Sequence, residues 1–179
     1  MRGGLPVAEP EPPVEPIEIT SIAAADTPKR LLYALDTSVL SGVFLLDLET
    51  GEERRLFHSN ELRVRSLARE PAGTRIACSL FRPNGSKSLA LIEADGGGLA
   101  ELTEGDSIDA APSWCGGGRI VYQSCGLARL AGGVVESGPI GVHSLDLERG
   151  TVETLLEDPQ HDYLVPRMAQ GALLHPKAL

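Results

Sequence analysis

The sequence predicts an all-β protein made of repeated four-stranded antiparallel units. Hydrophobic residues make up 42% of its 179 residues but aromatic residues only 4%, so Leu, Val, Ile and Ala must fill most of the core. Its 20 Gly and 13 Pro indicate many turns, and no long stretch has the period of an amphipathic helix. Two short patterns also recur roughly every 45 residues, a typical length for one unit of a repeat protein.

Residues 1–28 are predicted to be a poorly ordered tail or linker. Glu9, Glu11 and Glu15 lie among prolines, and this composition buries too little apolar side chain to order a segment. Residues 17–23, IEITSIA, alternate apolar and polar positions and are consistent with an isolated strand. The sequence has no signal-peptide core and no membrane-spanning stretch, so we expect a soluble chain. Its compartment stays unknown, since any export signal would lie outside the sequence.

A strand, a turn and a second strand recur three times after this tail. The copies are VFLLDLETGEERRLF (43–57), LALIEADGGGLAELT (89–103) and VHSLDLERGTVETLL (142–156). Each first strand ends at an acid, namely Asp47, Glu93 or Asp146, and a glycine follows, namely Gly51, Gly97 or Gly150. Glycine takes the left-handed conformation that short hairpin turns need, and a carboxylate accepts hydrogen bonds from turn amides. We therefore interpret these acids as turn-forming residues rather than metal ligands.

A second pattern comes before each hairpin. It reads RLLYAL (30–35), RIACSL (75–80) and RIVYQS (119–124), with a shorter copy, ALLH, at 172–175. The segments in front of the later copies are LAREPAGT (67–74), PSWCGGG (112–118) and PRMAQG (166–171). In this arrangement Trp114 ends an inner strand and Gly116 to Gly118 make a tight turn into the next strand. We expect Trp114 and Gly118 to be structural, with the indole packed over the turn.

Four short strands per repeat are typical of a β-propeller blade. We place blades at residues 30–57, 62–103 and 108–156, and the start of another at 163–175, within a partial propeller at 29–179. An immunoglobulin-like sandwich also has short strands with frequent turns and stays as an alternative. About three blades do not close a ring of four or more, which indicates a fragment of a larger propeller. Open edges are then predicted near 30–35 and 171–175, through which the chain self-associates.

The repeats resemble the TolB-like, WD-repeat-like family of propellers, whose pattern is P-x-W-S-P-D-G-x-x-I-x-F/Y followed by an I/V-x-x-D-L-x-x-G hairpin. PSWCGGGRIVY keeps the Pro, the Trp, the last Gly and the apolar strand, but has Cys115, Gly116 and Gly117 where Ser, Pro and Asp are usual. DLETG and DLERG fit the hairpin closely, and the resemblance extends over residues 30–175. It implies a non-catalytic scaffold that binds protein partners in the cell envelope. The alternative is the propeller section of a prolyl oligopeptidase-like serine hydrolase whose catalytic domain lies outside this sequence.

Acidic residues gather in the loops that leave one side of such blades. These loops join strand two to strand three and strand four to the next blade, and the basic side chains in the same segments are few. An acidic rim of this kind can recruit a basic partner or a cation, although solvated loops carry the same composition. The candidate partner-binding residues are Asp36, Glu61, Glu104, Asp106, Asp109, Glu136, Asp158 and Asp162.

Composition and motifs argue against several function classes. A net charge of −9 disfavours binding to nucleic acid and to anionic membranes. The sequence has no GxSxG elbow, phosphate-binding loop, HExxH or EF-hand spacing, so no catalytic residue and no cofactor are expected. Cys78, Cys115 and Cys125 form no CxxC, and the four His share no ligand spacing, so we expect ordinary thiols and no metal site.

Overall fold

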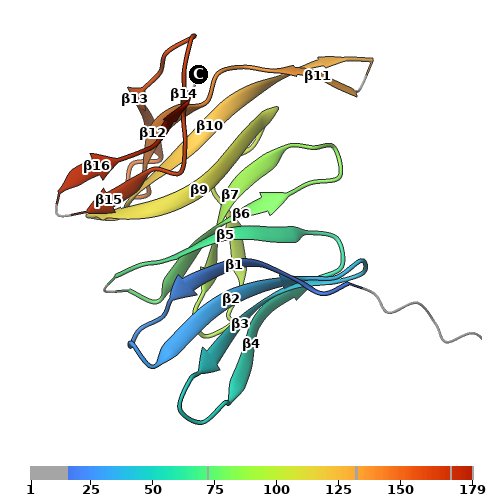
Figure 1. Ribbon diagram of the computed structural model, residues 1–179, viewed down its shortest axis with the longest axis vertical. Coiled ribbons are helices and arrows are strands. Elements are labelled where there is room, and N and C mark those ends of the chain that lie inside the picture. The colour runs from blue at the N-terminus through green and yellow to red at the C-terminus, as the bar shows by residue number, and fades with distance from the viewer. Residues whose placement is uncertain (1–15, 72, 132, 170, 179) are drawn as a thin grey trace, which may run out of the picture.

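The computed structural model describes residues 16–71, 73–131, 133–169 and 171–178. These residues form strands and turns without any helix, which confirms the all-β class. The strands pair antiparallel, except for one parallel bridge between Lys87 and Ile108, and form four-stranded layers that are stacked in an open fan (Figure 1). Residues 1–15, which contain the Pro/Glu-rich part of the predicted tail, lie outside the described residues.

Blade 1 is a complete four-stranded sheet. It contains β1 (Glu18–Ala24), β2 (Arg30–Asp36), β3 (Ser41–Asp47) and β4 (Glu53–Ser59), paired in that order. The blade therefore begins at Glu18 and not near residue 30, and the IEITSIA strand is paired with β2 and not isolated. Because β2 has β1 on one side and β3 on the other, the open edge expected at 30–35 does not exist.

Blades 2 and 3 follow the predicted four-stranded plan. Blade 2 contains β5 (Arg63–Arg69), β6 (Arg75–Phe81), β7 (Lys87–Glu93) and β8 (Leu99–Glu101). Blade 3 contains β9 (Ser107–Gly116), β10 (Arg119–Leu130), β12 (Gly141–Asp146) and β13 (Thr151–Leu156). The far half of β10 forms an additional hairpin with β11 (Gly133–Ser137).

A fourth, shorter unit covers the far side of blade 3. It contains β15 (Arg167–Ala169) paired with β16 (Ala172–Leu174), and β14 (Asp162–Tyr163) paired with β17 (Lys177–Ala178). Backbone and side-chain hydrogen bonds attach it to blade 3, among them Met168 N to Ser113 Oγ at 3.4 Å and Tyr163 N to Ile140 O at 2.9 Å. Val121 and Val142 of blade 3 are consequently buried.

The cores lie between the blades. Leu32, Ala34 and Val43 of blade 1 pack against Ile76, Cys78 and Leu80 of blade 2. The next interface joins Ala77 and Leu89 of blade 2 to Trp114, Ile120 and Tyr122 of blade 3. The inner strands β1, β5, β9 and β15 contact one another in sequence, as expected around a propeller axis.

The hairpin turns use the predicted chemistry, with one difference. Gly51, Gly118 and Gly150 have φ values of 73°, 68° and 65°, in the left-handed region. The Asp47 carboxylate accepts hydrogen bonds from the amides of Glu49 and Thr50, and Asp146 does the same in its own turn. In the middle hairpin Gly96 takes the left-handed conformation and Gly97 does not, because this turn closes one residue earlier, from Gly96 N to Glu93 O.

Candidate functional site: the loop face

The loops that carry the acidic residues are brought together by contacts between neighbouring blades. We call this surface the loop face, and it consists of residues 36–42, 58–62, 81–87, 104–107, 125–131, 133–140 and 157–162. Arg129 donates to Asn84 O and so joins two of these segments, and Arg63, which directly follows residues 58–62, donates to Thr37 O and Ser38 O. Ile140 N donates to Asp162 in the same manner. The β10–β11 hairpin extends from this side of the molecule, at the upper right of Figure 1.

Asp36 is an internal ion-pair residue of the blade 1–blade 2 interface. Its two carboxylate oxygens lie 2.7 Å from Arg63 Nη1 and 2.8 Å from Arg65 Nη1. The side chain is almost fully buried, and both guanidinium groups come from β5 in the next blade. A carboxylate paired in this way stabilises the interface and contributes little negative charge to the surface.

Asp109 and Asp106 also have partners in the protein, the first buried and the second exposed. Asp109 is buried and accepts a 2.6 Å hydrogen bond from Ser124 Oγ on the neighbouring strand. Asp106 pairs with Arg129, whose Nη2 atom is buried and has no hydrogen-bond partner among the described residues. These two acids therefore fix the base of the β10–β11 hairpin.

Asp158 and Asp162 organise the last loop. Asp158 accepts from the amide of Gln160 and contacts His161 Nδ1 at 2.7 Å, while Lys177 Nζ lies 3.8 Å away. The Gln160 amide first, and then His161, lower the pKa of Asp158 below its usual value. Asp162 accepts from Ile140 N at 2.8 Å and so attaches this loop to blade 3.

The remaining predicted acids, Glu61, Glu104 and Glu136, point outward. All three are exposed, and none forms an ion pair with any residue that the structure describes. Of the eight predicted acids, five thus have hydrogen-bond or ion-pair partners in the protein, and three are exposed without an ion pair among the described residues. Sequence reasoning could not separate these two groups.

A depression lies beside Glu61 on the loop face. It has a volume of about 610 Å³ and lies between the segment that joins blades 1 and 2 and the β6–β7 loop. Leu62, Phe81 and Pro83 supply its apolar surface, and Arg63 and Arg82 line it as well. Arg82 forms an ion pair with Glu101, so its charge is balanced within the protein. The depression offers an apolar floor next to a free carboxylate.

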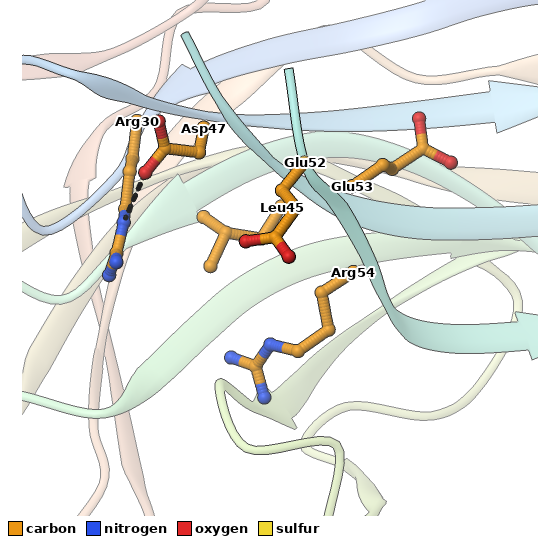
Figure 2. A pocket seen from close by; sticks show the side chains of 6 residues that line it. All are labelled: Arg30, Leu45, Asp47, Glu52, Glu53 and Arg54. Atoms are coloured by element: carbon orange, nitrogen blue, oxygen red, sulfur yellow. Dashed lines mark hydrogen bonds and ion pairs between the residues drawn. The ribbon is translucent and has the colours of Figure 1, made fainter. Parts of the chain in front are cut away.

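Another depression lies at the opposite ends of the strands, in blade 1. Figure 2 shows Arg30 directed at Asp47, with Leu45, Glu52, Glu53 and Arg54 around them. Arg30 Nε lies 3.4 Å from Asp47 Oδ2, and Arg54 donates to Ala94 O in blade 2 at 2.9 Å. Glu53 accepts from the Tyr33 hydroxyl. Most of its polar groups thus have partners in the protein, as is usual for turn residues.

A third hollow follows the inner strands. It has a volume of about 320 Å³ and is lined by β1, β5, β9 and β15, with Arg69 and Arg167 as its charged side chains. Arg69 donates to Gly73 O at 2.9 Å and Arg167 to Pro112 O at 3.3 Å. Both guanidinium groups are therefore held beside the propeller axis by backbone carbonyl groups and not by carboxylates.

Sequence reasoning missed a recurring kink in the inner strands. Ser66, Ala111 and Val165 have φ values of 54°, 52° and 43°, which are unusual for residues other than Gly. They occupy corresponding positions, and in blades 2 and 3 the strand pairing shifts register beside them. Ala111 and Val165 precede Pro112 and Pro166, but Ser66 precedes Leu67. A following proline favours extended backbone with negative φ, so the sequence carries no common signal for this kink.

Other chemistry-bearing groups are dispersed. No group of three or more His, Cys, Asp or Glu side chains suited to a metal ion occurs among the described residues. Cys78, Cys115 and Cys125 are free thiols, and burial raises the pKa of Cys78 to about 12. Within the described part of the chain, no helix is long and apolar enough to span a bilayer.

Comparison with known proteins identifies the fold. No protein-family model matches the chain, and no curated protein matches it. A protein from Agrobacterium tumefaciens assigned as TolB is 23% identical, with a TM-score of 0.56, and the match covers 72% of this chain and 45% of that one. TolB from Acinetobacter baumannii is 13% identical, with a TM-score of 0.59, over 87% of this chain and 35% of its own. Puromycin hydrolase is 15% identical, with a TM-score of 0.60, over 84% of this chain and 23% of its own.

These similarities concern architecture. The chain spans less than half the length of each of the three solved structures, and the stacked four-stranded sheets with adjacent inner strands are the part they share. The predicted propeller class is confirmed and the sandwich alternative is discarded. The chain has the fold of part of a TolB-like β-propeller.

Proposed function

We propose that this chain is a non-catalytic propeller scaffold whose loop face binds a basic segment of a protein partner. The observation that carries the proposal is the outward placement of Glu61, Glu104 and Glu136, which have no ion-pair partner among the described residues. Three uncompensated carboxylates on one surface create a negative potential that steers a cationic partner toward it.

The surroundings of these carboxylates suit a protein partner better than a free cation. Arg63 and Arg129 fix the loops from which the carboxylates project, so the surface is organised before binding. The depression beside Glu61 supplies the apolar contact area of Leu62, Phe81 and Pro83. An apolar centre with a polar rim is the usual composition of a protein interface. A cell-envelope setting, which the resemblance implies, stays a prediction.

Peptide binding tests this function directly. Two fluorescein-labelled probes are compared by anisotropy, one of alternating Lys and Gly and one of alternating Glu and Gly. We expect only the basic peptide to bind, and more weakly as salt rises, because exposed charges are screened over about 10 Å at 0.1 M salt. The triple variant Glu61→Gln, Glu104→Gln, Glu136→Gln should raise the Kd by about threefold to 150-fold, since exposed ion pairs contribute about 0.2–1 kcal/mol each.

The matched control removes the same charge from the opposite side. Glu49, Glu52 and Glu148 lie in turns at the other ends of the strands and are exposed. Their triple Gln variant changes the net charge equally and should leave the Kd within twofold. Equal loss in both variants would mean that total charge and not the loop face binds the peptide, and the proposal would be abandoned.

The fold similarity to puromycin hydrolase supports a second candidate, a propeller section attached to a hydrolase domain. In that case this chain contributes access control and no nucleophile. Mass spectrometry of the native protein decides between the two. A polypeptide near 18.9 kDa favours the scaffold, and a much longer one with a serine hydrolase sequence favours the second candidate.

A further inference from the structure

One face of blade 1 is apolar over its first three strands, β1 to β3, and has no sheet packed on it in the described structure. Paired residues of adjacent strands lie on the same face of a sheet, which allows the two faces to be separated. Leu32, Ala34 and Val43 face blade 2. The opposite face, which we call the open face, contains Ile19, Ile22, Leu31, Tyr33, Leu35, Phe44 and Leu46 on the first three strands, and Glu53, Arg55 and His58 on the outer strand β4.

The open face corresponds to surfaces that are buried elsewhere in the same chain. In each blade one residue of the second strand is paired with a residue near the end of the inner strand. This residue is Leu31 in blade 1, Ile76 in blade 2 and Ile120 in blade 3, so the three positions correspond. Two residues later, Tyr33 corresponds to Cys78 and Tyr122. In blades 2 and 3 these residues are almost completely buried, and each packs on the preceding blade.

Blade 1 lacks this cover. Leu31 and Tyr33 are only half-buried, and Ile22 on the adjoining strand is 61% exposed. Tyr33 and Phe44 stack on each other with ring centroids 5.3 Å apart, and both are half-buried. The open face therefore has the residues of a blade interface without the second blade.

The other end of the stack exposes the complementary position. The pairing of Met168 with Leu173 matches that of Trp114 with Ile120, so Leu174 corresponds to Val121, Ala77 and Leu32. Those three residues are buried against the following unit. Leu174 is 55% exposed, because no described segment follows β16 on that side. The C-terminal unit thus exposes the kind of surface that a following unit covers elsewhere in the chain. Blade 1 exposes the kind of surface that a preceding blade covers.

We propose that the open face of blade 1 binds the C-terminal β15–β16 unit of a second copy of this chain, and that two copies close a ring through two such contacts. The new contact would continue the existing series, in which β2 contacts β5 and β6 contacts β9. Here β16 of one copy contacts β1 of the other. A head-to-tail contact of this kind produces a closed ring when its rotation matches the number of units.

The number of units agrees with closure. The described residues of each copy contain four inner strands, β1, β5, β9 and β15, so those of two copies contain eight. Propellers typically have about four to eight blades, so an eight-unit ring is within the observed range. Apolar burial at both contacts supplies the driving force for association. This assembly is independent of the proposed function, because the loop face is not part of the new contact.

Light scattering on the full chain gives the primary test. We expect a mass twice the 18.9 kDa of the chain, in equilibrium with monomer on dilution. Ile22→Glu and Leu174→Glu should each raise the dimer Kd at least tenfold, since each places a carboxylate in an apolar contact. Both sites are exposed in the single chain, so circular dichroism should remain unchanged. Val39→Glu is the control, because Val39 is 63% exposed in the β2–β3 loop, away from the open face.

Cysteine pairing identifies the ends that meet. Two variants of the chain are mixed, and both contain Cys115→Ser. One variant also contains Ile22→Cys, and the other contains Leu174→Cys. We expect the mixed disulfide dimer to dominate after mild oxidation. A dimer of Ile22→Cys copies alone would indicate two open faces packed together and would overturn the head-to-tail contact. A filament without a fixed mass would overturn the ring. A monomer at high concentration would also overturn it and would mean that another polypeptide covers the open face.

Discussion

Trp114 shows how one side chain joins two blades. Its indole is 7% exposed and packs among Ala77 and Ile120, while Nε1 donates to Ala68 O in blade 2 at 2.9 Å. The Arg75 guanidinium lies 5.2 Å from the ring centroid, and Glu70 holds this guanidinium by two hydrogen bonds. The residue therefore combines apolar burial, a hydrogen bond and a cation–π contact between neighbouring sheets.

Replacing Trp114 is expected to destabilise the protein without affecting the loop face. Trp114→Ala should lower the free energy of unfolding by about 3–5 kcal/mol, as expected for removal of a buried aromatic side chain. Trp114→Phe keeps most of the apolar contact and should cost less, because mainly the hydrogen bond to Ala68 and some packing are lost. Urea unfolding followed by circular dichroism measures both. Unchanged stability in the alanine variant would contradict the structural role.

A structural role for Trp114 can be proposed from local sequence, whereas the ion pairs of Asp36 cannot be anticipated from it. Trp114 lies in a local pattern with proline and glycine whose turn chemistry depends on nearby residues alone. Asp36 meets Arg63 and Arg65 across two blades, and their contact depends on how one sheet is stacked on another. The sequence therefore located the acidic loops but did not distinguish paired carboxylates from free ones.

Hairpins are the elements in which sequence and structure agree best. In the first and last hairpins an Asp and a left-handed Gly close the turn as expected, whereas in the middle hairpin the shorter turn transfers the left-handed position to Gly96. Strand β1 was assigned to the tail because its residues follow a Pro/Glu-rich segment and its partner strand could not be identified from local sequence. Local turns are thus more predictable than pairing at an element boundary.

A glycine pair tests the turn chemistry. Gly150 has a φ of 65° and open space around an added Cβ, so Gly150→Ala introduces backbone strain without a clash. We expect a loss of about 1–2 kcal/mol in the free energy of unfolding, the usual cost of a left-handed conformation. Gly126→Ala is the control, because this glycine also has open space but no left-handed φ. Thermal unfolding compares the two, and an equal effect would contradict the turn argument.

The molecule as a whole is a linear stack of units, each in contact with its neighbours. Blade 1 rests on blade 2, blade 2 on blade 3, and the C-terminal unit on blade 3. Stability then depends on the interfaces as much as on the individual sheets. Carboxylates with lowered pKa values hold turns and loops at several points along this stack.

Acid is expected to weaken the folded state through these carboxylates. Turn amides lower the pKa of Asp47, Arg75 lowers that of Glu70, and the Gln160 amide lowers that of Asp158. A carboxylate whose pKa is lowered by folding stabilises the folded state at pH values above its pKa in the unfolded chain, about 3.9 for Asp and 4.3 for Glu. This stabilisation is lost as the pH falls through the pKa of the folded state. The free energy of unfolding in urea should therefore be similar at pH 7 and pH 5 and lower at pH 3. A maximum at pH 3 would contradict this assignment.

The buried thiol of Cys78 can report transient separation of blades 1 and 2. Its thiol lies in the core between blades 1 and 2, fully enclosed by Leu32, Ala34 and their neighbours, and burial suppresses its ionisation. An alkylating reagent can reach the sulfur only when the two sheets separate, because the reactive species is the exposed thiolate. The rate at which Cys78 is labelled under native conditions therefore reports how often this interface opens. Cys78 is thus an intrinsic chemical probe of the transient separation of blades 1 and 2.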